Sequence, residues 1–151
     1  MWRSFLRQKR GQEEAVRNRF PYCFACGESN PIGLHLSFNR NGPFVEAVFS
    51  PTELHQGYPD IVHGGIVTTL LDEAMAYALE FDGYRGVTAR LRVRFLKPLR
   101  PKNMYRIIGY LGKVRGKIAR VYSEIRDKDN NTMAKAEALF FINSEIGGDQ
   151  Y

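Results

Sequence analysis

One nearly apolar segment constrains this chain more than any other. It runs over residues 61–78, and the glycine pair Gly64–Gly65 opens the helix that we expect within it. Its apolar residues recur at so many helical positions that they cover more of the circumference than a surface helix needs. We therefore expect a buried helix that ends just before Gly83. Two adjacent carboxylates, Asp72 and Glu73, stand in its middle, and burying a carboxylate is costly unless it is hydrogen-bonded, paired or used. This conflict indicates a functional site.

The segments around this helix have the pattern of strands. The predicted strands are 34–39, 44–50, 87–96, 105–113, 117–127 and 133–142. In the strand after the helix, apolar residues alternate with cations, so one face should be core and the other wet and basic. The fold class is α+β: an antiparallel sheet of about five or six strands can wrap around one long helix and bury it on most sides.

The length and charge of the chain predict a single domain with short appendages. With 151 residues, we expect a basic N-terminal helix or arm over 1–20, one domain over 21–143 and a flexible tail over 144–151. No apolar run is long enough for a membrane span or a signal peptide, which predicts a cytoplasmic protein. The net charge of +6 indicates an anionic partner.

The chain has two cysteines, Cys23 and Cys26, in a C-x-x-C pattern. In a reducing compartment they are expected to be free thiols in a tight loop. One such pair lacks the four ligands of a structural zinc site, so we predict no metal. A zinc ion shared across a dimer axis by two pairs is the less favoured alternative.

The central motif resembles a known family. His63-Gly64-Gly65, with Asp72 seven residues after the second glycine on a helix of small residues, resembles the hotdog-fold acyl-CoA thioesterases of the phenylacetyl-CoA thioesterase (PaaI-like) group. The resemblance covers residues 23–142, and the loop from Cys23 to Leu34 is similar to one branch of the group. It implies a hotdog fold and hydrolysis of an acyl-CoA to free CoA and a carboxylic acid. No cofactor is implied, because coenzyme A is part of the substrate.

The resemblance also implies the roles of four residues. The residue matching Asp72 acts as nucleophile or as general base for water, and the amide matching Gly64 polarises the thioester carbonyl. Thr88 matches a position that orients the attacking water, and Gln56 a polar position near the thioester. The chemistry of a helix start agrees, because its free N–H groups and positive dipole end can bind an oxyanion.

Further residues are candidates for binding substrate. Gly65 lets a substrate approach the helix start closely. His63 beside it could bind substrate, although a hydrogen-bonded structural histidine is the favoured interpretation. Arginine and lysine suit the phosphates of CoA, and the candidates for this contact are Arg90, Arg92, Arg115 and Lys117. For Glu73 we expect a structural pairing with an arginine.

The spacing of the two catalytic groups has a consequence for assembly. From Gly64 to Asp72 the helix rises roughly 12 Å, so one thioester carbonyl cannot contact both within one chain. The site must combine the helix start of one protomer with the carboxylate of another. The resemblance implies the same, since these thioesterases form dimers with two composite sites. We expect a homodimer, or a tetramer built from dimers.

Three rival functions differ in their products. A non-enzymatic hotdog protein would bind acyl-CoA without releasing thiol, and it would not need Asp72. An enoyl-CoA hydratase pairs an aspartate with a following histidine, but no histidine follows Asp72 in this chain. Nucleic-acid binding through the basic arm would give steep salt dependence. Neither a nucleic acid nor a membrane is expected as partner. The sequence does not identify the acyl group of the substrate.

Overall fold

The computed structural model describes residues 20–143, so the predicted arm, except its last residue, and the predicted tail lie outside the described part. Within these residues the fold has one long helix and six strands, with a short 3-10 helix, η1, before the long helix. The elements are β1 (Asn39–Asn41), β2 (Phe44–Phe49), η1 (Glu53–His55), α2 (Gly64–Phe81), β3 (Gly86–Phe95), β4 (Tyr105–Arg115), β5 (Ile118–Arg126) and β6 (Thr132–Ile142).

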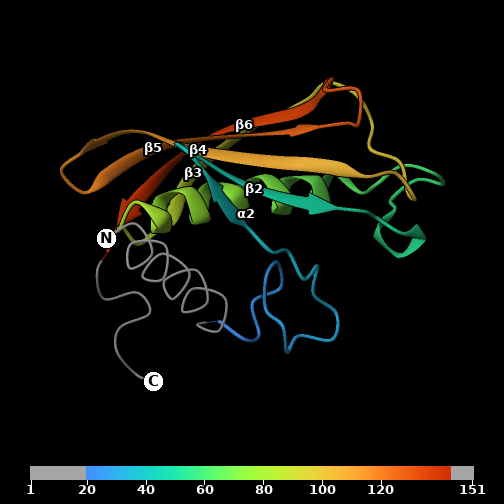
Figure 1. Ribbon diagram of the computed structural model, residues 1–151, viewed down its shortest axis with the longest axis horizontal. Helices are drawn as coiled ribbons and strands as arrows, with labels where there is room; N and C mark the ends of the chain where they lie inside the picture. Colours follow the sequence, from blue (N-terminus) through green and yellow to red (C-terminus); the bar gives the residue numbers. More distant parts are fainter. Residues whose placement is uncertain (1–19, 144–151) are drawn as a thin grey trace, which may run out of the picture.

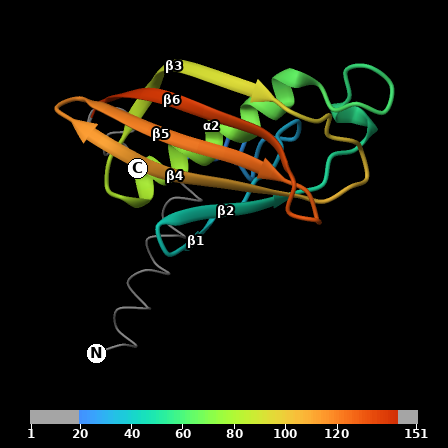
Figure 2. The same cartoon turned by 90° about the horizontal axis from the view of Figure 1, so that it is seen from above.

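The six strands form one sheet in the order β1-β2-β4-β5-β6-β3 (Figure 2). Every neighbouring pair is antiparallel. The sheet arches over α2, which lies along one of its faces (Figure 1). This is the expected α+β arrangement of a hotdog fold, a helix held in a curved antiparallel sheet.

The helix α2 has the predicted position and ends. His63 is its N-cap, and Gly83, at φ +87°, follows its C-cap Asp82. A left-handed residue just after a helix is favourable for glycine because it has no Cβ. Gly109 of β4 allows the helix to lie close to the sheet, since a Cβ there would collide with the backbone carbonyl of Ala74. The fully buried side chains of the helix are Leu70, Leu71, Ala74, Met75 and Leu79.

A loop covers the side of α2 that faces away from the sheet (Figure 1). It comprises residues 20–38, and Phe38 at its end stacks on Tyr77 of the helix with ring centroids 4.7 Å apart. The strand predicted over 34–39 is wrong for most of its length, because β1 begins only at Asn39. The apolar alternation of Leu34, Leu36 and Phe38 reflects burial in the core, not a strand of the sheet.

The alternation predicted for β3 holds only in part. A register shift between Thr88 and Arg90 turns Thr88 toward the helix side, opposite Phe140. Val87 is therefore 49% exposed, not buried in the core. An extra residue in one strand moves the residues that precede it to the opposite faces of the sheet. The sequence pattern alone does not reveal such an extra residue. Among the described strands, β3 is the last of the sheet and pairs only with β6.

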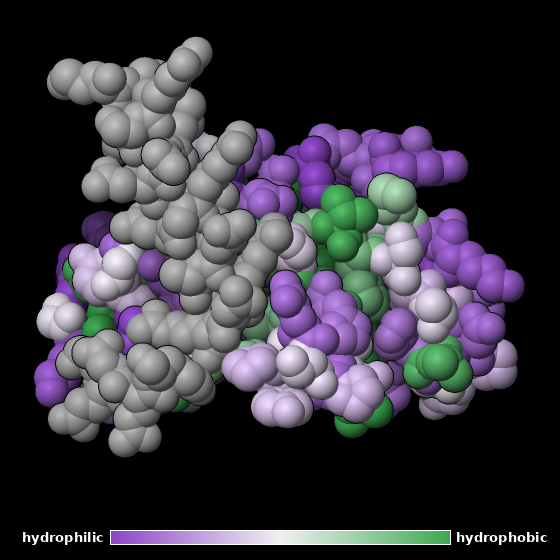
Figure 3. Space-filling model, turned by 60° about the horizontal axis from the view of Figure 1, so that its bottom comes forward, coloured by the Kyte–Doolittle hydropathy of each residue, from purple (hydrophilic) through white to green (hydrophobic). Residues whose placement is uncertain are grey.

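The surface seen from the loop side is mostly polar, with small apolar groups between polar side chains (Figure 3). Among residues 20–143, no helix is both long and apolar enough to cross a membrane.

Candidate functional site

Asp72 and Thr88 form the first part of the site. Asp72 projects from the middle of α2 toward β3, where it is partly exposed. The Thr88 hydroxyl donates a hydrogen bond of 2.7 Å to Asp72 Oδ1. The register shift in β3 makes this contact, since it turns Thr88 to the helix side. A carboxylate held by one hydrogen bond keeps its other oxygen for a reactant.

The second part of the site is the start of α2. The N–H of Gly65 donates to His63 Nδ1 at 2.8 Å. The N–H groups of Ile66 and Val67 both donate to the backbone oxygen of His63, at 2.9 and 3.1 Å. Of the four N–H groups that open the helix, only that of Gly64 has no partner among residues 20–143. The positive end of the helix dipole therefore presents one free donor.

Gln56 and His63 belong to the same end of the molecule as Gly64. Gln56 and Val62 form a β-bridge, and the His63 N–H donates to the backbone oxygen of His55 at 2.9 Å. Gln56 Oε1 accepts the N–H of Asp60 at 2.9 Å, so its carbonyl holds the loop in shape. The Nδ1 atom of His63 is used by the cap, which agrees with the favoured structural role of this histidine.

The structure thus divides the predicted catalytic residues into two groups. Asp72 and Thr88 form one group, and Gly64 with Gln56 forms the other. Each group has one residue on α2, but the rise of the helix separates Gly64 from Asp72 by roughly 12 Å. A single thioester carbonyl cannot touch both groups of one chain.

This architecture agrees with the family comparison. Residues 60–134, which contain α2, β3, Gly64, Asp72 and Thr88, match the model of the thioesterase superfamily. The chain belongs to the thioesterase superfamily. An uncharacterised protein of Schizosaccharomyces pombe is 39% identical over 80 residues, which are 52% of this chain and 46% of the yeast protein. This thioesterase superfamily member therefore matches less than half the length of that relative.

Several solved structures share the fold. A crystal structure described as a thioesterase superfamily protein is 27% identical, with a TM-score of 0.75 over 78% of this chain and 62% of that chain. A Streptococcus mutans protein bound to acetyl CoA is 18% identical, with a TM-score of 0.67 over 72% of this chain and 88% of that one. The PaaI protein of E. coli is 19% identical, with a TM-score of 0.68 over 74% of this chain and 81% of that one. The predicted hotdog fold is confirmed.

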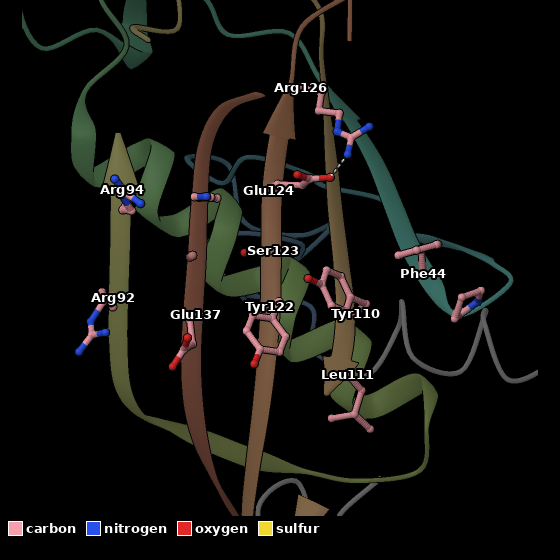
Figure 4. Close-up of a pocket in the computed structure, with 13 residues that line it drawn as sticks. Phe44, Arg92, Arg94, Tyr110, Leu111, Tyr122, Ser123, Glu124, Arg126 and Glu137 are labelled. Atoms are coloured by element: carbon pink, nitrogen blue, oxygen red, sulfur yellow. Dashed lines mark ion pairs between the residues drawn. The ribbon is translucent and has the colours of Figure 1, made fainter. Parts of the chain in front are cut away.

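The four predicted phosphate contacts lie away from Asp72 in this thioesterase superfamily chain. Arg90 and Arg92 are on the face of β3 that points away from α2, opposite Leu139 and Glu137. Arg92 lines a groove of about 870 Å³ on this outer face, with Tyr110 and Tyr122 (Figure 4). The sheet therefore separates Arg92 from Asp72.

Arg115 and Lys117 occupy the hairpin turn between β4 and β5. This turn lies at the end of the molecule where α2 finishes (Figure 1), opposite from Gly64. Lys117 Nζ stands 6.0 Å from the ring centroid of Phe141. Their contact with CoA stays a prediction, as does that of Arg90 and Arg92.

Glu73 has a different partner from the one expected. Its Oε1 lies 3.7 Å from Cys23 Sγ, and residues 20–143 contain no arginine paired with it. The predicted arginine pairing is therefore wrong for the described part of the chain. Burial raises the pKa of Glu73 to about 8. Sequence reasoning missed this contact because Cys23 and Glu73 are 50 residues apart and no spacing rule connects a loop to a helix face.

Proposed function

We propose that this protein is an acyl-CoA thioesterase, which hydrolyses an acyl-CoA thioester to free CoA and a carboxylic acid. The observation that carries the proposal is the hydrogen bond from Thr88 to Asp72, which orients a carboxylate on the helix of a thioesterase superfamily fold. The free N–H of Gly64 supplies the complementary group. A solved structure of similar fold was obtained with acetyl CoA bound, which supports this substrate class.

The reaction needs a base or nucleophile and an oxyanion donor at one carbonyl. In the proposed step, Asp72 removes a proton from water, and the hydroxide attacks the thioester carbon while Gly64 N–H donates to the carbonyl oxygen. Collapse of the tetrahedral intermediate breaks the C–S bond, and the CoA thiolate leaves and takes up a proton. Alternatively, Asp72 attacks the carbon itself and water hydrolyses the anhydride. Neither route requires a cofactor beyond the CoA of the substrate.

The proposed site is composite, with Gly64 from one protomer and Asp72 from its partner. Three features of the surface support a second copy beside β3. The strand is a long sheet edge, and exposed edges of this kind pair readily with another chain. Apolar side chains of β3 and of the residue after it are uncovered, with Phe95 58% and Leu96 47% exposed. Asp72 and the neighbouring Thr68 face this side and are only partly buried.

Binding of the CoA phosphates is assigned to four cations of the chain. We propose that Arg115 and Lys117 contact phosphate, with Arg90 and Arg92 as further candidates. The cytoplasmic location expected from the sequence belongs to the same proposal, together with a homodimer or a tetramer built from dimers.

Replacing one carboxylate oxygen tests the function. Asp72→Asn keeps the size of the side chain but removes the base, so kcat for thiol release should fall at least about a hundredfold across a panel of acyl-CoAs. Asp129→Asn, in the turn between β5 and β6, is the matched control and should retain wild-type turnover. If folded Asp72→Asn turns over like the control, Asp72 is neither the base nor the nucleophile and the proposed mechanism is wrong. If the wild type binds acyl-CoA without releasing thiol, the protein is a binding module.

A further inference from the structure

A cluster of two thiols and a carboxylate lies beneath α2, apart from the Asp72 and Gly64 groups. It consists of Cys23 and Cys26 from the N-terminal loop and Glu73 from the helix. The two sulfur atoms and a carboxylate oxygen all lie within 4.8 Å of one another. Cys26 is 7% exposed, and the side chain of Glu73 is mostly shielded from solvent.

The backbone of the loop holds the two thiols in place. Gly27 directly follows Cys26, and its N–H donates to the Cys23 carbonyl at 2.9 Å. A Cβ at position 27 would approach the backbone of Cys23 and Pro21 to about 2.5 Å, so only glycine fits this turn. Hydrogen bonds from Leu34 to Phe24 and from Leu36 to Ala25 fasten the intervening residues. The loop thus fixes its thiols independently of the helix that carries Glu73.

Within residues 20–143, Glu73 has no cation as a partner. A buried carboxylate is costly unless a charge or several hydrogen bonds compensate it. No lysine, arginine or histidine of residues 20–143 forms an ion pair with Glu73, and its carboxylate lies beside the Cys23 thiol. Two thiols and a carboxylate, all of which can become anions, therefore lie together, and no cationic side chain of the described residues pairs with the carboxylate.

We propose that Cys23, Cys26 and Glu73 form a binding site for zinc within a single chain. With Zn–S bonds of about 2.3 Å and Zn–O bonds of about 2.0–2.2 Å, tetrahedral coordination places the ligand atoms roughly 3.5–3.8 Å apart. The Cys23 to Glu73 distance of 3.7 Å already meets this requirement. The largest separation in the cluster, 4.8 Å at most, needs a contraction of only about 1 Å.

The donor set selects this kind of ion. Thiolate ligands favour zinc and other thiophilic cations over magnesium and calcium, which prefer oxygen alone. Three protein ligands leave one position for a water molecule. Binding displaces the protons that the ligands carry, and the metal then supplies the charge that Glu73 lacks. The ion joins the loop to the helix turn that also contains Asp72, but the site does not depend on the proposed thioesterase activity.

Metal binding by the purified full chain tests the proposal. After reduction with a phosphine, incubation with zinc and buffer exchange, elemental analysis should find about one zinc per chain. Cobalt in place of zinc should give a thiolate-to-cobalt charge-transfer band in the near ultraviolet. Since loss of an outer-shell partner alone weakens metal affinity about 10–100-fold, loss of a direct ligand in Cys23→Ser, Cys26→Ser or Glu73→Gln should cost at least tenfold.

Glu53→Gln is the control, because Glu53 is an exposed carboxylate of η1 away from the cluster, and it should bind zinc like the wild type. Circular dichroism checks that each variant is folded. The cobalt spectrum of the wild type needs no variant at all. Absence of its thiolate band overturns the proposal, as does equal zinc binding by the wild type and the cysteine variants.

Discussion

The N–H of Gly64 is the residue-level feature on which the proposed chemistry depends. Gly64 is the first helical residue after the N-cap His63, a position at which the N–H has no partner within the helix. The cap and the following turn satisfy the next three N–H groups, so the start of the helix keeps one donor, the Gly64 N–H, without a partner among residues 20–143. The glycine is not needed for space inside its own chain, since a Cβ there would meet only the Phe95 ring at 3.7 Å.

Proline at position 64 isolates the role of this donor. Proline is favoured at the first position of a helix, and His63, with φ −57° and ψ 133°, already has the extended conformation that suits a residue before proline. Gly64→Pro should therefore leave the fold intact while it removes the N–H. Loss of one oxyanion donor should lower kcat about 100–1,000-fold.

Gly64→Ala is the matched comparison, because it adds a Cβ but keeps the N–H. Its loss of thiol release should be much smaller than that of Gly64→Pro. Equal losses in two folded variants would show that the space at position 64, and not the donor, matters.

Residue types were easier to predict than their contacts. The sequence pattern indicated Asp72 as the principal carboxylate, since the glycine pair fixes the helix start and the count along the helix follows. It did not predict the partner of Glu73, because that contact depends on how the cysteine loop folds back on α2. A contact between segments that are distant in sequence leaves no periodic signal in either of them.

Among the elements, α2 depends most on how closely β4 approaches it. Gly109 lies against the backbone of Ala74, at the centre of the contact between helix and sheet. Any side chain there must push the helix away from a tightly packed core.

Gly109→Ala should therefore destabilise the protein by about 1–3 kcal/mol, the usual cost of overpacking a core. Thermal unfolding followed by circular dichroism should show a midpoint several degrees lower than that of the wild type. Gly64→Ala, where the added Cβ meets only an ordinary contact, is the control for an added methyl group. An unchanged midpoint for Gly109→Ala would mean that the helix can move outward without loss of packing.

The predicted elements differ from the observed ones where the chain leaves regular periodicity. The helix and the three strands β4 to β6 were predicted within a few residues, because the helix is apolar along its length and the strands alternate over most of theirs. The residues before β1 alternate like a strand but pack as a loop. In β3 the register shift at Thr88 moves Val87 out of the core, and it is the same shift that brings the Thr88 hydroxyl to Asp72.

At the level of the whole molecule, the curved sheet leaves one long edge at β3 and a partly uncovered side of α2 next to it. A second copy related by a twofold axis would cover both at once and would bring its own helix start toward Asp72. This arrangement accounts for the separation of the two groups of site residues along one helix.

Mixed dimers distinguish a shared site from a site within one chain. Co-expression of Asp72→Asn and Gly64→Pro with two different affinity tags gives a heterodimer in which each chain has one defect. If Gly64 of one protomer works with Asp72 of its partner, one of the two sites is fully intact and the other has both defects. The heterodimer should then recover about half of the wild-type turnover per dimer, although both parent homodimers are nearly inactive. If each site used one chain alone, both sites would be defective and thiol release would stay at the level of the parents.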